Sequence, residues 1–139
     1  MNVQKIFIAS IAGAATLFAC GYIIYVLLFG NSNIGLESSA EGVMLTSAGT
    51  RFSGIIVMEL LYGLLLAVTL NWKGTNGFAS GLVPGALLGA LIGFTFGLDL
   101  FSTTSLVNFN YVIYSGITYL VRYSLAGGVI AMILGNPSE

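Results

Sequence analysis

Charge is scarce in this 139-residue chain, and histidine is missing altogether. Asp, Glu, Lys and Arg together make up 6% of the residues, against about 25% in an ordinary soluble domain. Four basic residues are too few for a nucleic-acid-binding surface, so we expect no nucleic acid among the partners. Without histidine there is no imidazole ligand for haem, zinc or copper, and no Ser-His-Asp triad.

Cysteine is almost as rare, and recognisable catalytic motifs are lacking. The single cysteine, Cys20, can form no internal disulfide, and we expect it to be a small packing residue in an apolar segment. The chain has no Walker A loop and no glycine-rich dinucleotide fingerprint. We therefore expect no cofactor, no bound metal and no enzymatic activity.

Apolar residues dominate what is there. They reach 57% of the chain, and the mean hydropathy is +0.98. A soluble domain of this length has no interior large enough to hide several long apolar runs. The composition therefore predicts an integral membrane protein, with the lipid bilayer as its solvent.

Four apolar segments have the length of a membrane-spanning helix. They cover about residues 6–29, 52–70, 78–101 and 111–134, and about 20 residues are enough to cross a hydrocarbon core roughly 30 Å thick. The first segment is too long for the apolar core of a removable signal peptide, so we expect it to remain as a span. The sequence predicts an all-α, polytopic membrane protein, with four transmembrane helices in a single domain over residues 1–139.

The connections between these spans are short, apart from residues 30–51. Within them, Ser38-Ser39-Ala40-Glu41 has the spacing of a capping box. The motif predicts a short helix over residues 39–48, lying at the membrane interface; a plain polar loop is the alternative.

The few basic residues outside the spans indicate an orientation. Lys5 and Lys73 fall on one side of the predicted membrane and Arg51 on the other. The positive-inside rule then favours a multi-pass protein with both termini in the cytoplasm. The margin is one side chain and the N-terminal amine, so insertion both ways up is the competing possibility.

The third span carries a glycine at every fourth position, at Gly81, Gly85, Gly89, Gly93 and Gly97. In water each glycine weakens a helix by about 1 kcal/mol relative to alanine, but in hydrocarbon no water competes for the backbone and the helix is retained. This spacing stacks the five residues into one row, the glycine ridge, which a partner backbone can approach closely. We expect the ridge to pack inside one four-helix subunit; packing between subunits and lining of a pore are the alternatives.

The first span offers a partner surface for this ridge. Ala9, Gly13, Thr16 and Cys20 recur at helical spacing and share one face. Such small residues favour a close approach of two helices.

Two charged residues fall deep inside the spans. Counted from the same side, Glu59 lies seven residues into the second span and Arg122 eleven into the fourth. A rise of 1.5 Å per residue puts them at depths of roughly 10 and 16 Å, an offset that an arginine side chain can cover. A lone charge at the bilayer centre costs about 2.5–3.5 kcal/mol. We therefore expect Glu59 and Arg122 to be partners, with Asp99 as a second carboxylate at the mouth of the site.

Polar residues on the fourth span favour an inward-facing lining near this pair. Tyr111, Ser115 and Thr118 precede Arg122 at helical spacing, and Tyr119 lies beside them. The arrangement has two interpretations. It is either an ion, proton or anionic-ligand site, or a structural ion pair that fixes how the second and fourth helices pack.

One resemblance supplements these inferences. The run GALLGALIGFTFGLDLFSTTSLVNFNYV and the tail SLAGGVIAMILG resemble the closing half of a bacterial family of small four-helix membrane proteins with a domain of unknown function. The resemblance implies a bacterial protein of the cell inner (plasma) membrane and brings no established activity. Its polar residues would be Thr103, Thr104 and Asn108, which equally suit helix capping. Arg122 and the connection over residues 30–51 are not matched to the family pattern.

Two functional classes remain. The first is a non-catalytic helix bundle that serves as a packing or accessory subunit of a membrane assembly, or as a homo-oligomer. Short loops and the glycine ridge favour it. The alternative is a small proton- or ion-coupled transporter or channel that uses Glu59 and Arg122, in which the weak Lys/Arg bias would allow antiparallel pairing, as in some small multidrug exporters.

Overall fold

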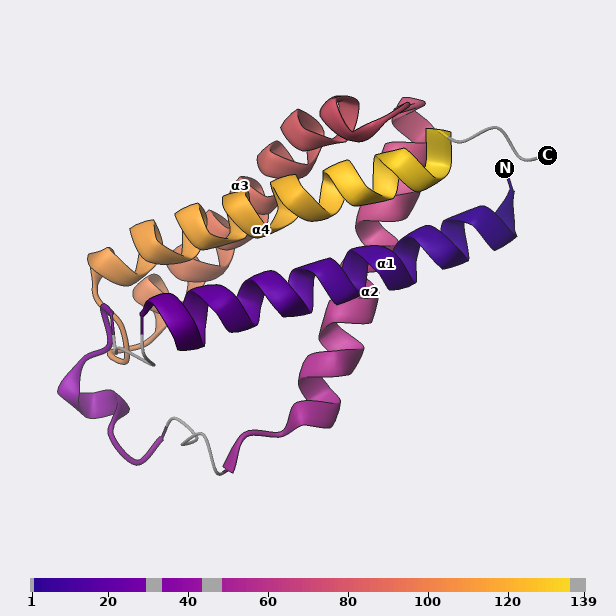
Figure 1. Ribbon diagram of the computed structural model, residues 1–139. Coiled ribbons are helices and arrows are strands. Elements are labelled where there is room, and N and C mark those ends of the chain that lie inside the picture. Colours follow the sequence, from indigo (N-terminus) through magenta and orange to yellow (C-terminus); the bar gives the residue numbers. More distant parts are fainter. Residues whose placement is uncertain (1, 30–33, 44–48, 136–139) are drawn as a thin grey trace.

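The computed structural model consists of four long helices (Figure 1), with a long connection between the first and second of them and short connections elsewhere. It describes residues 2–29, 34–43 and 49–135. The elements in chain order are helix α1 (Val3–Tyr22), the π-helical turn η1 (Ile23–Leu28), the 3₁₀ turn η2 (Ser38–Ala40), and the helices α2 (Phe52–Lys73), α3 (Phe78–Thr103) and α4 (Phe109–Gly135).

The described part of the chain is all-helical and contains no β-strand; Leu36 and Val107 form an isolated bridge. Each long helix, with η1 counted as part of the first, is long and apolar enough to span a membrane. The helix ends differ from the predicted ones by at most three residues, as at the end of α2, which continues past Leu70 to Lys73. The apolar runs therefore located all four helices.

The four helices do not all pack against one another to the same extent. α4 packs against α3 and against α1, and α2 crosses α1. Figure 1 shows that the N-terminal half of α2 extends away from the other three helices, and that the two chain ends lie at the same end of the molecule. Along that half, Phe52, Ile56, Val57 and Leu61 are exposed.

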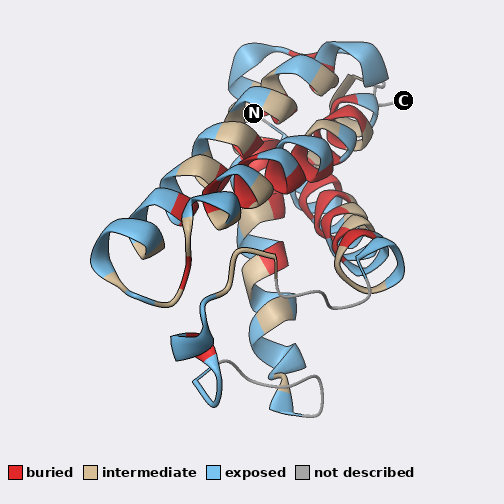
Figure 2. Ribbon diagram, turned by 90° about the vertical axis from the view of Figure 1, so that its left-hand side faces the viewer, coloured by how far each residue is buried: buried red, intermediate tan, exposed pale blue. Residues whose placement is uncertain are grey.

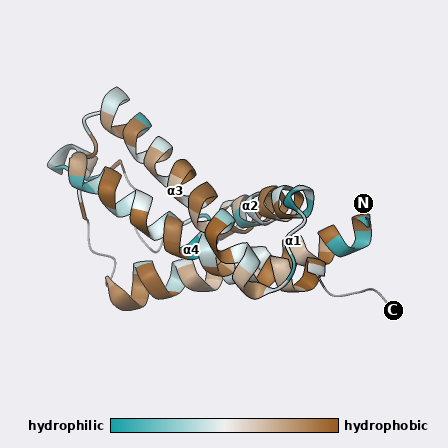
Figure 3. Cartoon of the chain, turned by 90° about the horizontal axis from the view of Figure 1, so that it is seen from above, coloured by the Kyte–Doolittle hydropathy of each residue, from teal (hydrophilic) through white to brown (hydrophobic). Residues whose placement is uncertain are grey.

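Apolar side chains occur both inside and outside. Figure 2 shows the buried residues on the sides of the helices that face one another, where Leu17, Leu66, Tyr123 and Ile130 form part of the core. Hydrophobic residues also cover the outer sides of all four helices (Figure 3). Water solvates such a surface poorly, and a hydrocarbon environment solvates it well.

The five glycines of α3 are all buried, and every one faces α4. A Cβ atom added at any of them would lie closer than 3.0 Å to an α4 atom, and at four of the five that nearest atom is a backbone carbonyl oxygen. On the facing helix, Gly127 lies equally close to the backbone of α3 near Gly81 and Gly85. The two backbones thus lie so close together that no methyl group would fit between them at any of the five glycines.

The prediction that these glycines pack against the small residues of the first helix is wrong, because they pack against α4. The small residues of α1 contact other helices: Gly13 faces Ile130 of α4 and Gly63 of α2, and Gly63 in turn faces Ser10 and Ala14. The connection from α3 to α4 is short, so α4 is already held beside α3, and α4 carries its own small residues at the contact. Small residues at helical spacing do not identify which helix they will meet.

The connection between α1 and α2 also differs from the expected helix over residues 39–48. Its described part has only the 3₁₀ turn η2, and residues 44–48 lie outside the described residues. The Ser39 hydroxyl donates to the carbonyl of Ser105, and the Glu37 amide donates to Leu106 (2.9 Å). In the expected capping box Ser38 would be the N-cap and Glu41 the N3 residue. The backbone of Glu41 is extended (φ −61°, ψ 130°), so no helix continues through it.

The polar residues of the α3–α4 connection bond to their own helix ends. The Thr103 and Thr104 hydroxyls donate to the carbonyls of Asp99 and Leu100, both at 2.6 Å. The Asn108 side chain accepts from the Asn110 amide (3.0 Å) at the start of α4. This is the capping role that the sequence allowed for Thr103, Thr104 and Asn108.

The close α3–α4 contact leads to a stability prediction. Gly89→Ala should lower the free energy of unfolding by about 1–3 kcal/mol, because the new methyl group overpacks the interface despite the better helix propensity of alanine. The matched control is Gly54→Ala on α2, where an added Cβ meets nothing within 4 Å. Thermal unfolding in mild detergent measures both, and equal stability of the two variants would contradict the contact.

Candidate functional site

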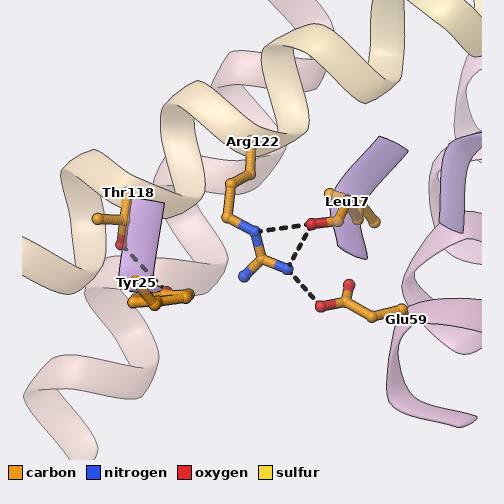
Figure 4. Close-up of polar contacts among 5 residues, drawn as sticks. All are labelled: Leu17, Tyr25, Glu59, Thr118 and Arg122. Carbon is orange, nitrogen blue, oxygen red and sulfur yellow. Dashed lines mark hydrogen bonds and ion pairs between the residues drawn. The ribbon is translucent and has the colours of Figure 1, made fainter. Parts of the chain in front are cut away.

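A buried ion pair joins α2 to α4. Nη2 of Arg122 donates to Oε1 of Glu59 (Figure 4). Arg122 is 3% exposed and Glu59 4%. The structure thus brings together the two charges that were expected to be partners, and places both away from solvent.

The guanidinium also bonds to the backbone of α1. Nε and Nη2 of Arg122 donate to the carbonyl oxygen of Leu17, at 3.3 and 3.1 Å (Figure 4). The guanidinium carbon lies 5.4 Å from the ring centroid of Tyr119 and 5.6 Å from that of Tyr25. Both distances suit a cation–π interaction. One side chain therefore contacts α1, η1 and α2 at once.

Gly21 makes room for this group. A Cβ atom there would lie 3.2 Å from Nη2 and 3.3 Å from Cζ of Arg122. The guanidinium therefore lies directly against the α1 backbone at Gly21, where a side chain would crowd it. Of the two α1 glycines that face other helices, Gly21 contacts the guanidinium of Arg122, whereas Gly13 contacts Ile130 of α4 and Gly63 of α2.

The π-helical turn η1 brings Tyr25 to the site. The amide of Phe29 donates to the carbonyl of Ile24 (3.2 Å), five residues back, so the backbone is wider here than in an α-helix. The Tyr25 hydroxyl lies 3.4 Å from Oγ1 of Thr118, and its ring packs edge-on against Tyr114 at 6.0 Å. The turn therefore holds Tyr25 against α4 and beside Arg122.

Tyr119 and two further tyrosines, Tyr62 and Tyr123, line the α2–α4 contact. Tyr119 and Tyr123 stack at 5.6 Å, and Tyr62 packs edge-on against both of them, at 6.3 and 5.5 Å. Within this region two buried polar atoms have no hydrogen-bond partner among the described residues, Oε2 of Glu59 and the Tyr123 hydroxyl. Such atoms are uncommon in proteins and each needs a physical explanation.

The predicted polar lining of α4 is divided among different neighbours. Ser115 donates to the carbonyl of Gly93 on α3 (2.9 Å), two turns of α4 before Arg122. Thr118 bonds within α4 and to Tyr25, while Tyr119 stays beside Arg122. Tyr111 is only partly buried, near Gly35 of the α1–α2 connection. Thr118 and Tyr119 are therefore near the pair, and Ser115 and Tyr111 are not.

Asp99 does not join the site as expected. It is exposed on α3, and no hydrogen bond or ion pair connects its side chain to Glu59 or Arg122 in the described structure. Asp99 follows Gly97 by two residues, which is about 200° around a helix. Since Gly97 faces α4, Asp99 points away from it.

The site offers charge and hydrogen bonds but no metal-ligand cluster. Within residues 2–29, 34–43 and 49–135, no three Cys, Asp or Glu residues are grouped so that they could hold a metal ion. Sequence reasoning missed the Leu17 carbonyl, Gly21, Tyr25 and Tyr123. A backbone carbonyl has no sequence signature, and the remaining three looked like ordinary residues of apolar spans.

Comparison with known proteins assigns the chain to no family. No protein-family model matches the chain, and neither a curated protein nor a solved structure matches it at a significant level. The resemblance to small bacterial four-helix proteins therefore stays a prediction.

The buried pair predicts a pattern of stabilities. Glu59→Gln or Arg122→Gln alone should lower the free energy of unfolding by about 3–5 kcal/mol, because each leaves the partner charge buried and unpaired. The double variant Glu59→Leu/Arg122→Met should recover most of this loss. Thermal unfolding in mild detergent tests the set, with exposed Glu37→Gln as the control. Two harmless single variants would show that the pair does not stabilise the protein.

Proposed function

We propose that the protein is a non-catalytic integral membrane helix bundle, which acts as a packing or accessory subunit of a membrane assembly or as a homo-oligomer. The observation that carries this proposal is the set of contacts around Arg122. Its charge is matched by Glu59, its Nε and Nη2 donate to the carbonyl of Leu17, and its flat face lies against the rings of Tyr25 and Tyr119. Groups engaged in this way hold helices together.

The outer surface supports insertion in a membrane. Four helices have the required length and hydropathy, and large apolar side chains are exposed on each of them. Lys5 and Lys73 belong to the end of the bundle that also carries both chain ends, and Arg51 belongs to the opposite end. By the positive-inside rule this supports a multi-pass protein with both termini in the cytoplasm. The resemblance to small bacterial four-helix proteins supports a bacterial inner membrane as its location.

The glycine ridge, in this proposal, is a packing seam within one subunit. Its five residues face α4 of the same chain, so a contact with another subunit would use a different surface. The N-terminal half of α2 is the most separated helical segment and exposes Ile56, Val57 and Leu61. This supports partners drawn from the same membrane, either further copies or other subunits.

A second candidate function is a small proton- or ion-coupled transporter or channel that uses the Glu59/Arg122 site. One observation favours it: Oε2 of Glu59 and the hydroxyl of Tyr123 are buried and have no partner among the described residues. Polar atoms with free hydrogen-bonding capacity inside a membrane are typical of ion and proton pathways.

The proposed function predicts that the protein extracted from its membrane has a mass greater than that of one chain. Native mass spectrometry of the protein, gently extracted from its source membrane, should show either added polypeptides or a homo-oligomer. Added polypeptides would identify an accessory subunit, with the exposed apolar helix faces as the docking surface. A bare monomer under conditions that preserve other assemblies of that membrane would contradict the proposal.

Transport and structure are separated by the variant that lacks both charges. Glu59→Leu/Arg122→Met is expected to fold, and its proton or ion flux in reconstituted vesicles should equal that of the unsubstituted protein if the pair is structural. The control is Asp99→Asn, which changes an exposed carboxylate outside the site. Flux that is present in the control and abolished in the folded double variant would establish the transporter instead.

A further inference from the structure

Two unpartnered polar atoms lie in the least accessible part of the molecule. Glu59 is 4% exposed and Tyr123 is fully buried, yet Oε2 of the first and the hydroxyl of the second bond to nothing in the described structure. Figure 4 shows that Oε2 is turned away from the guanidinium, which contacts Oε1. A buried group left in this state destabilises a protein by about 1–3 kcal/mol.

The two atoms border the same contact between helices. Glu59 bonds to Arg122, and Tyr123 is the next residue of α4. Tyr62, one turn after Glu59 on α2, packs edge-on against the Tyr123 ring at 5.5 Å. Both unpartnered atoms therefore belong to the α2–α4 interface beside the ion pair.

The chemistry of the two atoms selects the occupant. A carboxylate oxygen only accepts, so the occupant must donate to Glu59; a phenol both donates and accepts, so the same occupant can accept from Tyr123. The charge of Glu59 is already balanced by Arg122. A cation would add an uncompensated charge to this buried site, and an ammonium group could accept nothing from the phenol.

We infer that the α2–α4 interface contains a binding site for one internal water molecule, which donates to Oε2 of Glu59 and accepts from the Tyr123 hydroxyl. Water is the smallest neutral molecule with both functions, and buried waters bond to two to four polar groups that the protein leaves unsatisfied. The inference rests on these two atoms and is independent of the proposed function, since a structural bundle and a transporter could both contain the site.

The test is Tyr123→Phe, which removes only the hydroxyl. With the bridging water present, the substitution breaks a hydrogen bond and should shift the unfolding equilibrium roughly fivefold to tenfold toward the unfolded state. In the Glu59→Leu/Arg122→Met background the water loses its carboxylate, so the same substitution should be neutral or stabilising. Tyr22→Phe, at an exposed tyrosine of α1, is the matched control and should have no effect in either background.

Two results would overturn the inference. One is a Tyr123→Phe variant that is as stable as, or more stable than, the unsubstituted protein, because removing a dry, unpartnered hydroxyl relieves a cost. The other comes from an experimental structure of the unsubstituted protein that resolves ordered water. Density within hydrogen-bonding distance of both atoms supports the site, and a direct Tyr123–Glu59 bond refutes it, even if the variant fails to fold.

Discussion

The guanidinium of Arg122 needs compensation from several parts of the chain, because a buried charge is stable only when it is paired and hydrogen-bonded. Glu59 supplies the opposite charge from α2, and Leu17 supplies a carbonyl from α1. Gly21 lets the α1 backbone come close enough for that carbonyl to be reached, and the wider turn of η1 brings the ring of Tyr25 to the remaining side. One side chain of α4 thus bonds to both α1 and α2 where the three helices meet.

Two different forces connect the helices. α3 and α4 touch backbone to backbone along the glycines, where dispersion between closely packed atoms and the absence of side chains favour contact. α1 and α2 also cross at small residues, Gly63 against Ala14. The two helix pairs are then joined through the ion pair and the packing of Ile130 against Gly13. Close packing forms the pairs, and the buried charges add specificity to how the pairs meet.

The sequence predicts the helices much better than their neighbours. Apolar runs mark all four helices because hydropathy depends on residue type alone, and matching depth was sufficient to suggest that Glu59 meets Arg122. The glycines of α3 could have met any helix with small residues, so their contact with α4 was not predictable from spacing. Tyr25 reaches the site through a π-helical turn, which shifts side chains relative to the 3.6-residue pattern used to assign faces. The Ser39 hydroxyl bonds to a residue 66 positions away, information that a local capping motif does not contain.

The ion pair also constrains the order of events during synthesis. Its two residues are 63 positions apart, on the second and the last of the long helices. Because a chain emerges from the ribosome N-terminus first, α2 of the proposed membrane protein would enter the bilayer with its carboxylate before the arginine of α4 has been made. An unmatched charge in the bilayer costs a few kcal/mol, so the first helical hairpin is an incomplete intermediate until the C-terminal helix arrives. In a membrane, a chain truncated before Arg122 would therefore leave the carboxyl group of Glu59 buried without its partner.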